Sequence, residues 1–318
     1  MTEAEKAIKQ LIDTIASEVN EFNDAIPGVQ KDIFDGVQNL MKQLDVVGDT
    51  ITANVANMKA IAGFKDKMMG IIRKSDYPDA IKGFVDSFSA INDIQHEYFS
   101  ALSNDFTAPK LMAEVQKQSV ASALDSLTEV GLNAKLIKPV NDYLLKNIGQ
   151  GIKYTDAVNY LRDFITGSPE KDGALLSHAK TTTTDSLNQY ARQYSRLGAF
   201  GLGLEWGMYV GAIIDTSRPF CIACVAKKYI HQSEIDSLLA GDFPEFEDAD
   251  GEINPRTGLP SGLIDGTTPE NFSVYCGGWG CEHVWQPISE IVVPKSVRIE
   301  TYSRLGIPYD DEGFRAAA

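Results

Sequence analysis

The chain has 318 residues, of which 43% are hydrophobic and 23% are charged. This is the composition of an ordinary globular protein, so it excludes wholesale disorder and low-complexity architectures, and the length allows two or more domains. The formal net charge of −15 argues against a specific nucleic-acid ligand, because an acidic surface repels phosphate groups.

Apolar residues recur at helical spacing through the first third of the chain. The stripe that begins at Ile8 is expected to close at Pro27, and similar stripes follow over residues 33–44, 51–61 and 81–94. We predict a bundle or a set of extended amphipathic helices. Their apolar faces are expected to pack into the protein's own core, with packing on another subunit as the alternative.

The helical pattern continues over residues 111–165, and after a loop at 167–173 it predicts a long helix over 174–197. Beyond Gly203 the pattern changes. Aromatic and β-branched residues over 206–214 predict a strand, and we place a domain boundary here.

No segment predicts export or insertion into a membrane. Residues 1–10 carry acidic side chains and lack the apolar run of a secretory signal, so we expect synthesis in a cytoplasm. The longest apolar stretch, residues 199–214, contains Glu205 and is shorter than the roughly 18 residues that a spanning helix needs. We therefore expect a soluble chain that does not contact membranes.

All four cysteines lie in residues 221–281, which indicates that one local structure uses them together. Cys221 and Cys224 form a C-x2-C pair, a spacing that lets two thiolates reach one metal ion from a tight turn. About fifty residues later a glycine-rich turn offers Cys281 and His283. We predict a structural zinc ion bound by these four residues, with Cys276 as the alternate ligand.

Other interpretations of the same residues are possible. The thiols could pair as disulfides or pack as ordinary buried side chains, and His231 could replace one ligand. A catalytic zinc would need an open coordination position and a base such as Glu282, but the motifs of zinc deaminases and of H-E-x-x-H hydrolases are missing. We expect Asp215 and Arg218 to stabilise a turn.

Several segments together resemble a known family, the Mu F-like minor head proteins of tailed phages, over residues 111–294. The resemblance is carried by Ala179-Lys180-Thr181-Thr182-Thr183-Thr184-Asp185, by Asp215-x2-Arg218-Pro219-Phe220-Cys221, and by Gly277-Gly278-Trp279-x-Cys281-Glu282-His283-x-Trp285-x-Pro287. Glu282 stands where family members usually have arginine, and the usual Arg-Thr-Glu is replaced by Lys180 with threonines.

The resemblance implies a non-enzymatic minor capsid or head morphogenesis protein in the virion of a tailed bacteriophage. It would act near the portal, contact portal and major capsid proteins, and be oligomeric in the particle. A packaged zinc-dependent hydrolase or nuclease, or a membrane-active ejection protein, is the alternative.

The expected fold is mainly α with a small α+β, zinc-stapled C-terminal domain. We expect an amphipathic helical region over 1–107, the helical part of the Mu F-like region over 108–205, the Cys/His domain over 206–300, and a tail over 301–318.

Overall fold

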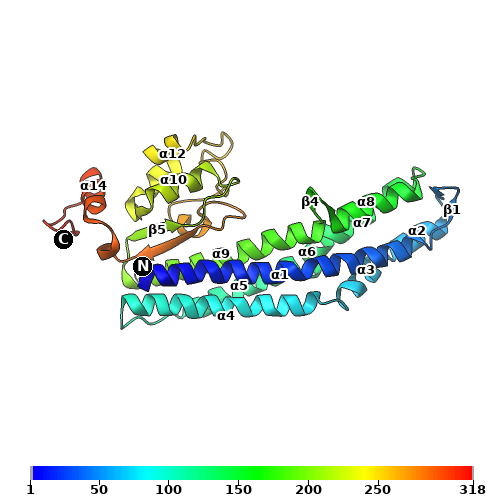
Figure 1. Cartoon of the computed structure of the whole chain (residues 1–318), viewed down its shortest axis with the longest axis horizontal. Helices are drawn as coiled ribbons and strands as arrows, with labels where there is room; N and C mark the ends of the chain where they lie inside the picture. The colour runs from blue at the N-terminus through cyan, green and yellow to red at the C-terminus, as the bar shows by residue number, and fades with distance from the viewer. Residues whose placement is uncertain (1–2, 317–318) are drawn as a thin grey trace. The chain divides into compact units, whose positions relative to one another are not determined.

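The computed structural model describes residues 3–316 and is mainly helical (Figure 1), which confirms the predicted fold class at this level. The chain divides into two compact units. The first unit comprises Met1–Ile15, Phe88–Lys117 and Thr184–Ala318, and the second comprises Ala16–Ser87 and Gln118–Thr183. The units therefore differ from the four consecutive parts expected from the sequence, because each unit combines segments that are far apart along the chain.

Four long helices contribute residues to both units: α1 (Glu3–Met41), α4 (Tyr77–Leu102), α5 (Leu111–Leu127) and α9 (Ala174–Leu202). The prediction that Pro27 ends the first helix was wrong. Proline removes only one backbone hydrogen bond, whereas the apolar stripe continues in phase on both sides of it and buries Ile26, Val29 and Ile33. Burial of this face outweighs the local cost of the proline.

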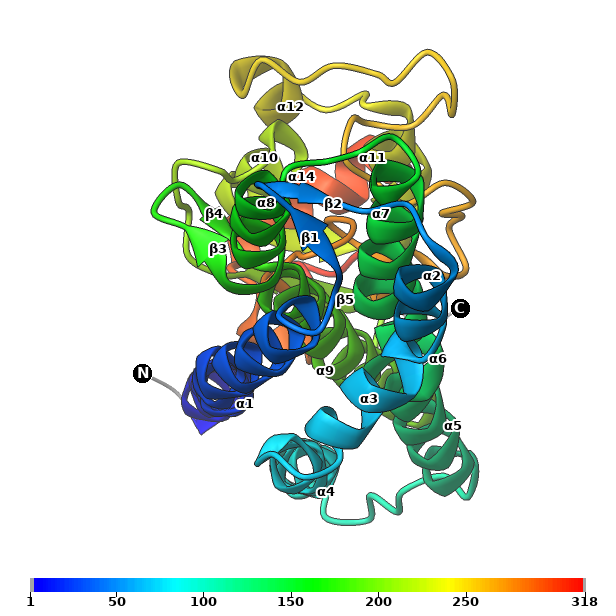
Figure 2. The ribbon, with the colours of Figure 1, turned by 90° about the vertical axis from the view of Figure 1, so that its right-hand side faces the viewer.

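The second unit also contains shorter helices and two hairpins (Figure 2). Its other helices are α2 (Val55–Ala62), α3 (Phe64–Ile72), α6 (Glu129–Leu132), the π-helix η1 (Asn133–Ile137), α7 (Lys138–Ile148) and α8 (Tyr154–Thr166). The hairpins pair β1 (Val46–Val47) with β2 (Thr50–Ile51), and β3 (Gly167–Ser168) with β4 (Lys171–Asp172). Helix α2 begins later than its predicted stripe because the side chain of Asn54 accepts a hydrogen bond from the backbone of Asn57 and caps it.

The first unit contains a three-stranded antiparallel sheet with the order β6-β5-β7. Its strands are β5 (Trp206–Val210), β6 (Tyr229–His231) and β7 (Val284–Ile288), and Trp206 is paired with both His231 and Ile288. Around the sheet lie α10 (Pro219–Lys227), η2 (Gln232–Glu234), α11 (Ile235–Ala240), α12 (Pro244–Asp248), α13 (Phe272–Tyr275), η3 (Glu290–Val292) and α14 (Lys295–Leu305).

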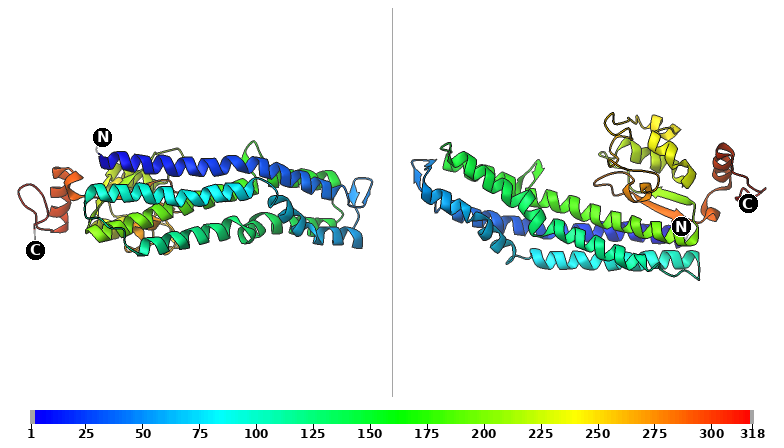
Figure 3. Two further views of the ribbon diagram at one scale, coloured as in Figure 1. Left: turned by 90° about the horizontal axis from the view of Figure 1, so that it is seen from below. Right: turned by 180° about the vertical axis from the view of Figure 1, so that it is seen from behind.

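Within the first unit, one face of the sheet lies beside α9 (Figure 3, right). Tyr98 of α4 donates a hydrogen bond to the carbonyl of Pro287 at 2.5 Å. The amide of Gln95 donates to the hydroxyl of Ser195 at 2.8 Å, and that hydroxyl donates in turn to the side chain of Gln286 at 3.3 Å. These buried contacts fix β7, and with it the residues just before β7, against two helices.

An aromatic core supports the other side of the sheet. The ring of Phe220 on α10 contacts Phe243, Phe246 and Phe272 edge-on, at centroid distances of 6.1 to 6.4 Å. Gly207 on β5 makes room for Trp285, because a Cβ there would lie 2.3 Å from the indole ring. This packing holds α10 against the sheet, where the helix contacts β5.

The last residues of the described chain are bound to α14 rather than extended as a free tail. The buried guanidinium of Arg298 donates to the carbonyls of Val293, Glu312 and Gly313, at 2.6, 2.8 and 3.0 Å, and lies 3.9 Å from the ring centroid of Phe314. In the part of the chain that the structure describes, no helix combines the length and the apolar character needed to cross a membrane.

Candidate metal centre

Two segments of the first unit bring three potential metal ligands together. Cys221 lies in the first turn of α10, and Cys281 and His283 lie just before β7. The two Sγ atoms are 3.9 Å apart, and Cys281 Sγ is 3.6 Å from His283 Nδ1. Ligand atoms of all three residues lie within 4.8 Å of one another. The group could hold a metal ion, and it contains three of the four ligands predicted from the sequence.

The remaining predicted ligand, Cys224, is outside this group. The C-x2-C pair was expected in a tight turn, but Pro219 begins a helix, and residues three apart on a helix differ by roughly 60° in direction. Cys224 is fully buried in the apolar core, and the thiol of the alternate ligand Cys276 donates to the carbonyl of Ser273 at 3.8 Å. Ligation by Cys224 or Cys276 stays a prediction.

His231, the other candidate ligand, belongs to a different environment. It lies on β6, packs edge-on against Trp206 and Tyr302, and approaches the carboxylate of Glu205 at 3.6 Å. Burial lowers the pKa of His231, and the nearby carboxylates of Glu205 and Glu234 oppose that shift. Among the described residues, the group that could hold a metal ion does not include His231.

Arg218 connects the two segments. It is the N-cap residue of α10, and its guanidinium donates to the carbonyls of Gly277 at 2.6 Å and Trp279 at 2.5 Å. From the sequence we expected Arg218 to stabilise its own turn together with Asp215. In the structure Arg218 instead bonds to the backbone of the distant glycine turn and fixes that turn relative to Cys221.

The glycines of this turn are required by its geometry. Gly277 and Gly278 have φ values of +79° and +81°, in the left-handed region that disfavours side chains. A Cβ at Gly277 would lie 2.1 Å from Cys281 Sγ, and a Cβ at Gly278 would lie 1.8 Å from the carbonyl oxygen of Gly262. The backbone can therefore close around the thiol only without side chains at these two positions.

Two residues of α9 support the same turn: Arg192, for which no role was predicted, and Asp185, which belongs to a segment of the resemblance but was not predicted to contact the turn. The guanidinium of Arg192 is buried and donates to the carbonyls of Cys281 at 2.9 Å and His283 at 2.5 Å. Asp185, seven residues earlier and so on the same helix face, accepts a hydrogen bond from the Gly280 amide at 2.6 Å. A sequence signal existed, because Arg192 is in phase with the buried stripe of α9.

The electrostatics of the group favour a thiolate at Cys281. The hydrogen bond from Cys221 lowers the pKa of Cys281, and His283 and Arg192 lower it further against the effect of burial. The same shared proton raises the pKa of Cys221. Nε2 of His283 is buried without a hydrogen-bond partner. Two thiols, one of them with a lowered pKa, and an imidazole whose Nδ1 lies 3.6 Å from Cys281 Sγ are suitable donors for a divalent ion such as zinc.

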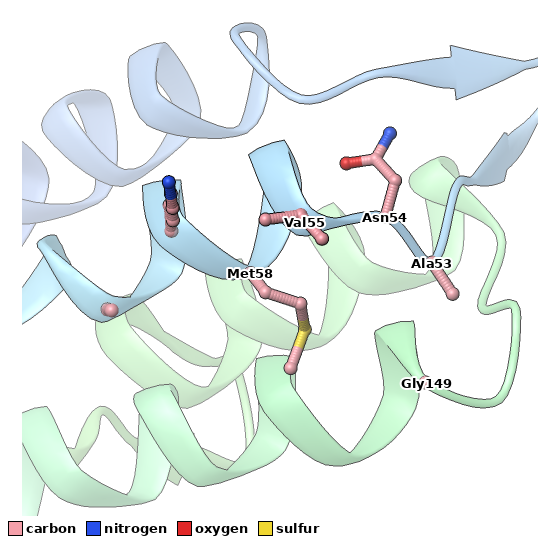
Figure 4. A pocket seen from close by; sticks show the side chains of 7 residues that line it. Ala53, Asn54, Val55, Met58 and Gly149 are labelled. Atoms are coloured by element: carbon pink, nitrogen blue, oxygen red, sulfur yellow. The ribbon is translucent and has the colours of Figure 1, made fainter.

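A pocket of about 550 Å³ lies in the second unit between α2 and the end of α7 (Figure 4). Met58 and Val55 project into it, and Ala53 and Gly149 line its edge. Lys59 is the one ionisable residue among those that line it. The pocket thus presents an apolar surface and no pair of groups for acid–base or nucleophilic chemistry.

Comparisons of the chain with protein-family models, with curated proteins and with solved structures gave no match.

Proposed function

We propose that the protein is a structural component of a tailed-phage virion, a minor capsid or head morphogenesis protein that acts near the portal and contains a structural zinc ion. The observation that carries the proposal is the meeting of the three segments that resemble the Mu F-like family. Asp185 bonds to the glycine turn, Arg218 bonds to the same turn, and Cys221 contacts Cys281. The residues of the resemblance are thus those that build one interlinked centre.

Burial favours a structural ion over a catalytic one. The side chains of Cys221, Cys281 and His283 are 1%, 4% and 6% exposed. A hydrolytic zinc needs a coordination position that water and substrate can reach, and a base beside it. Glu282, the carboxylate next to these ligands in sequence, lies at the exposed surface while its neighbours are buried. We therefore propose that the ion stabilises the fold and that the protein is not an enzyme.

The proposed partners are portal and major capsid subunits, with the protein oligomeric in the particle. This part of the proposal rests on the resemblance. It is supported by large apolar side chains that the first unit presents at its surface, of which Phe200 is 90% exposed and Trp279 is 56% exposed. Exposed aromatic residues of this kind are typical anchors of protein interfaces.

The proposal is tested on particles from the organism that carries the gene. Induced lysates are fractionated on a density gradient, and peptides of this chain and of the major capsid protein are quantified by mass spectrometry in each fraction. The expected result is co-sedimentation with filled heads at far fewer copies than the major capsid protein. Recovery of the chain only in the soluble or membrane fractions would contradict a role in the virion.

A further inference from the structure

The three ligands of the candidate centre leave one corner of a tetrahedron to be assigned, and a fourth polar atom lies beside them. The phenol oxygen of Tyr209 is 3.5 Å from Cys221 Sγ and 3.7 Å from Cys281 Sγ. We propose that Tyr209 is the fourth ligand, so that the ion is bound by two sulfurs, one imidazole nitrogen and one phenol oxygen. This inference deepens the proposed structural zinc centre and rests on it.

The distances among these atoms are those of a tetrahedral zinc site. Zinc bonds of ~2.3 Å to sulfur and ~2.0 to 2.1 Å to nitrogen or oxygen give edges of about 3.8 Å between two sulfurs and about 3.5 to 3.6 Å between sulfur and nitrogen or oxygen. The observed edges are 3.9 Å from Cys221 to Cys281, 3.6 Å from Cys281 to His283, and 3.5 and 3.7 Å from Tyr209 to the sulfurs. Four of the six edges of the tetrahedron therefore match the spacing that the ion requires, and the ligand atom of His283 lies within 4.8 Å of Cys221 Sγ.

The fold holds the phenol oxygen in this position from three sides. Tyr209 is on the central strand β5, where it pairs with Trp285, and its ring stacks on His283 with centroids 5.5 Å apart and planes at 17°. Its side chain is fully buried. Gly277 leaves space for the hydroxyl, because a Cβ there would lie 2.7 Å from it. Tyr209 therefore has little freedom to move away from the two sulfurs.

Charge balance supports ligation by a phenolate. A divalent ion with two thiolates, one neutral imidazole and one phenolate carries a net charge of −1. The buried Arg192 carries +1, and its hydrogen bonds go to backbone carbonyls of Val274, Cys281 and His283. The carboxylate of Asp185 accepts a hydrogen bond from the Gly280 amide and interacts electrostatically with both Arg192 and Arg218, so these three side chains together carry a net charge of +1. A buried charge is stable only with a compensating charge, and the anionic centre would supply it.

Metal binding should be coupled to loss of the phenol proton. The hydroxyl of Tyr209 donates a hydrogen bond to Cys221 Sγ at 3.5 Å, so it carries its proton in the protein without an ion. A bound divalent cation reverses the sign of the local field and favours the phenolate. The proton leaves to solvent as the oxygen–metal bond forms. Binding therefore produces the ultraviolet difference band of an ionised tyrosine.

The test is a titration of the chelator-treated, reduced full-length protein with zinc, followed by ultraviolet difference spectroscopy and by X-ray absorption at the zinc edge. We expect one tyrosinate band per ion, and a first shell of two sulfurs and two nitrogen or oxygen atoms. Tyr209→Phe should abolish the band and weaken zinc binding by more than about tenfold. Tyr302→Phe, at another buried tyrosine of the first unit, should retain the tyrosinate band and the zinc affinity of the wild-type protein.

Other results of this titration would overturn either ligation by Tyr209 or the metal centre itself. A shell of three sulfurs would overturn the proposal and point to Cys224 or Cys276. A band that is absent from the wild-type protein, together with unchanged affinity in Tyr209→Phe, would also overturn it and leave the hydroxyl as a hydrogen-bond donor to sulfur. Failure of the wild-type protein to bind zinc would overturn the metal centre itself. If Tyr209→Phe does not fold, the wild-type band and shell decide the question.

Discussion

The Sγ atoms of Cys221 and Cys281 lie 3.9 Å apart although the two residues are separated by 60 positions in the sequence. One belongs to the first turn of α10 and the other to the glycine turn before β7. Arg218 bonds to the second turn from the α10 side and Arg192 bonds to it from α9. The position of the two sulfurs is therefore determined by the packing of the first unit and not by flexible loops.

Replacement of Cys281 by serine should remove one of the two sulfur donors and release a bound ion. Structural zinc sites contribute on the order of 10 kcal/mol to folding, so we expect a loss of several kcal/mol in the free energy of unfolding. Urea denaturation in reducing buffer measures it. Cys276→Ala serves as the matched control, because that thiol is buried but bonds to Ser273, and it should retain the metal. Equal stability of the two variants would contradict a structural ion.

Substitution of Gly277 by alanine should disrupt the centre much more than the same change at Gly280. Both glycines have positive φ values, +79° and +67°, so both variants have the backbone strain of about 1 to 2 kcal/mol. Only at Gly277 would the new methyl group collide with Cys281 Sγ, whereas nothing lies within 4 Å at Gly280. Thermal unfolding and zinc content of the two variants measure the difference. Similar losses at both positions would show that the close approach is unimportant.

Replacement of Arg192 by methionine should destabilise the first unit by about 3 kcal/mol or more. The side chain bonds to three buried carbonyls, and each carbonyl left without a partner costs about 1 to 3 kcal/mol. Arg196→Met, on the exposed side of the same helix, should change the stability by less than about 0.5 kcal/mol. The comparison uses urea denaturation followed by tryptophan fluorescence. A small effect at Arg192 would contradict its role in supporting the turn.

Stability should fall as the pH decreases below about 6.5, in part because of His231. Its pKa is lowered in the folded state by burial, so the unfolded chain takes up the proton first and the folded state is favoured at higher pH. One such group contributes a slope of up to about 1.4 kcal/mol per pH unit. His231→Gln should reduce the slope of the unfolding free energy against pH, in the range between pH 6.5 and the lowered pKa of His231 in the folded protein. His96→Gln, at an exposed helical position, is the control for the histidine-to-glutamine change itself.

The sequence predicted the elements whose signals are local. The periodicity of apolar residues identified the long helices, and the run beginning at Trp206 identified strand β5, although the strand ends at Val210 and not at Ile214. The clustering of cysteines and the glycines before Cys281 located the candidate centre. In these cases the signal lies in a short stretch of sequence: a helical stripe, a strand or a cysteine-containing turn.

The sequence did not reveal the features that depend on tertiary packing. Tyr209 and Arg192 reach the centre only because β5 and α9 pack beside the glycine turn, and no short motif encodes that neighbourhood. The C-x2-C spacing is compatible with a turn or with a helix, and Pro219 at the helix start decided between them. Pro27 shows the same effect, because burial of a continuous apolar face overrides a local helix breaker.

The most direct test of the account is the metal content of the purified, reduced wild-type chain, measured by elemental analysis beside Cys221→Ser and Cys281→Ser. We predict one zinc ion per chain in the wild-type protein and its loss in both variants, with a lower melting temperature in each. Wild-type protein that contains no metal after purification in zinc-supplemented buffer, and that melts at the same temperature as both variants, would contradict it.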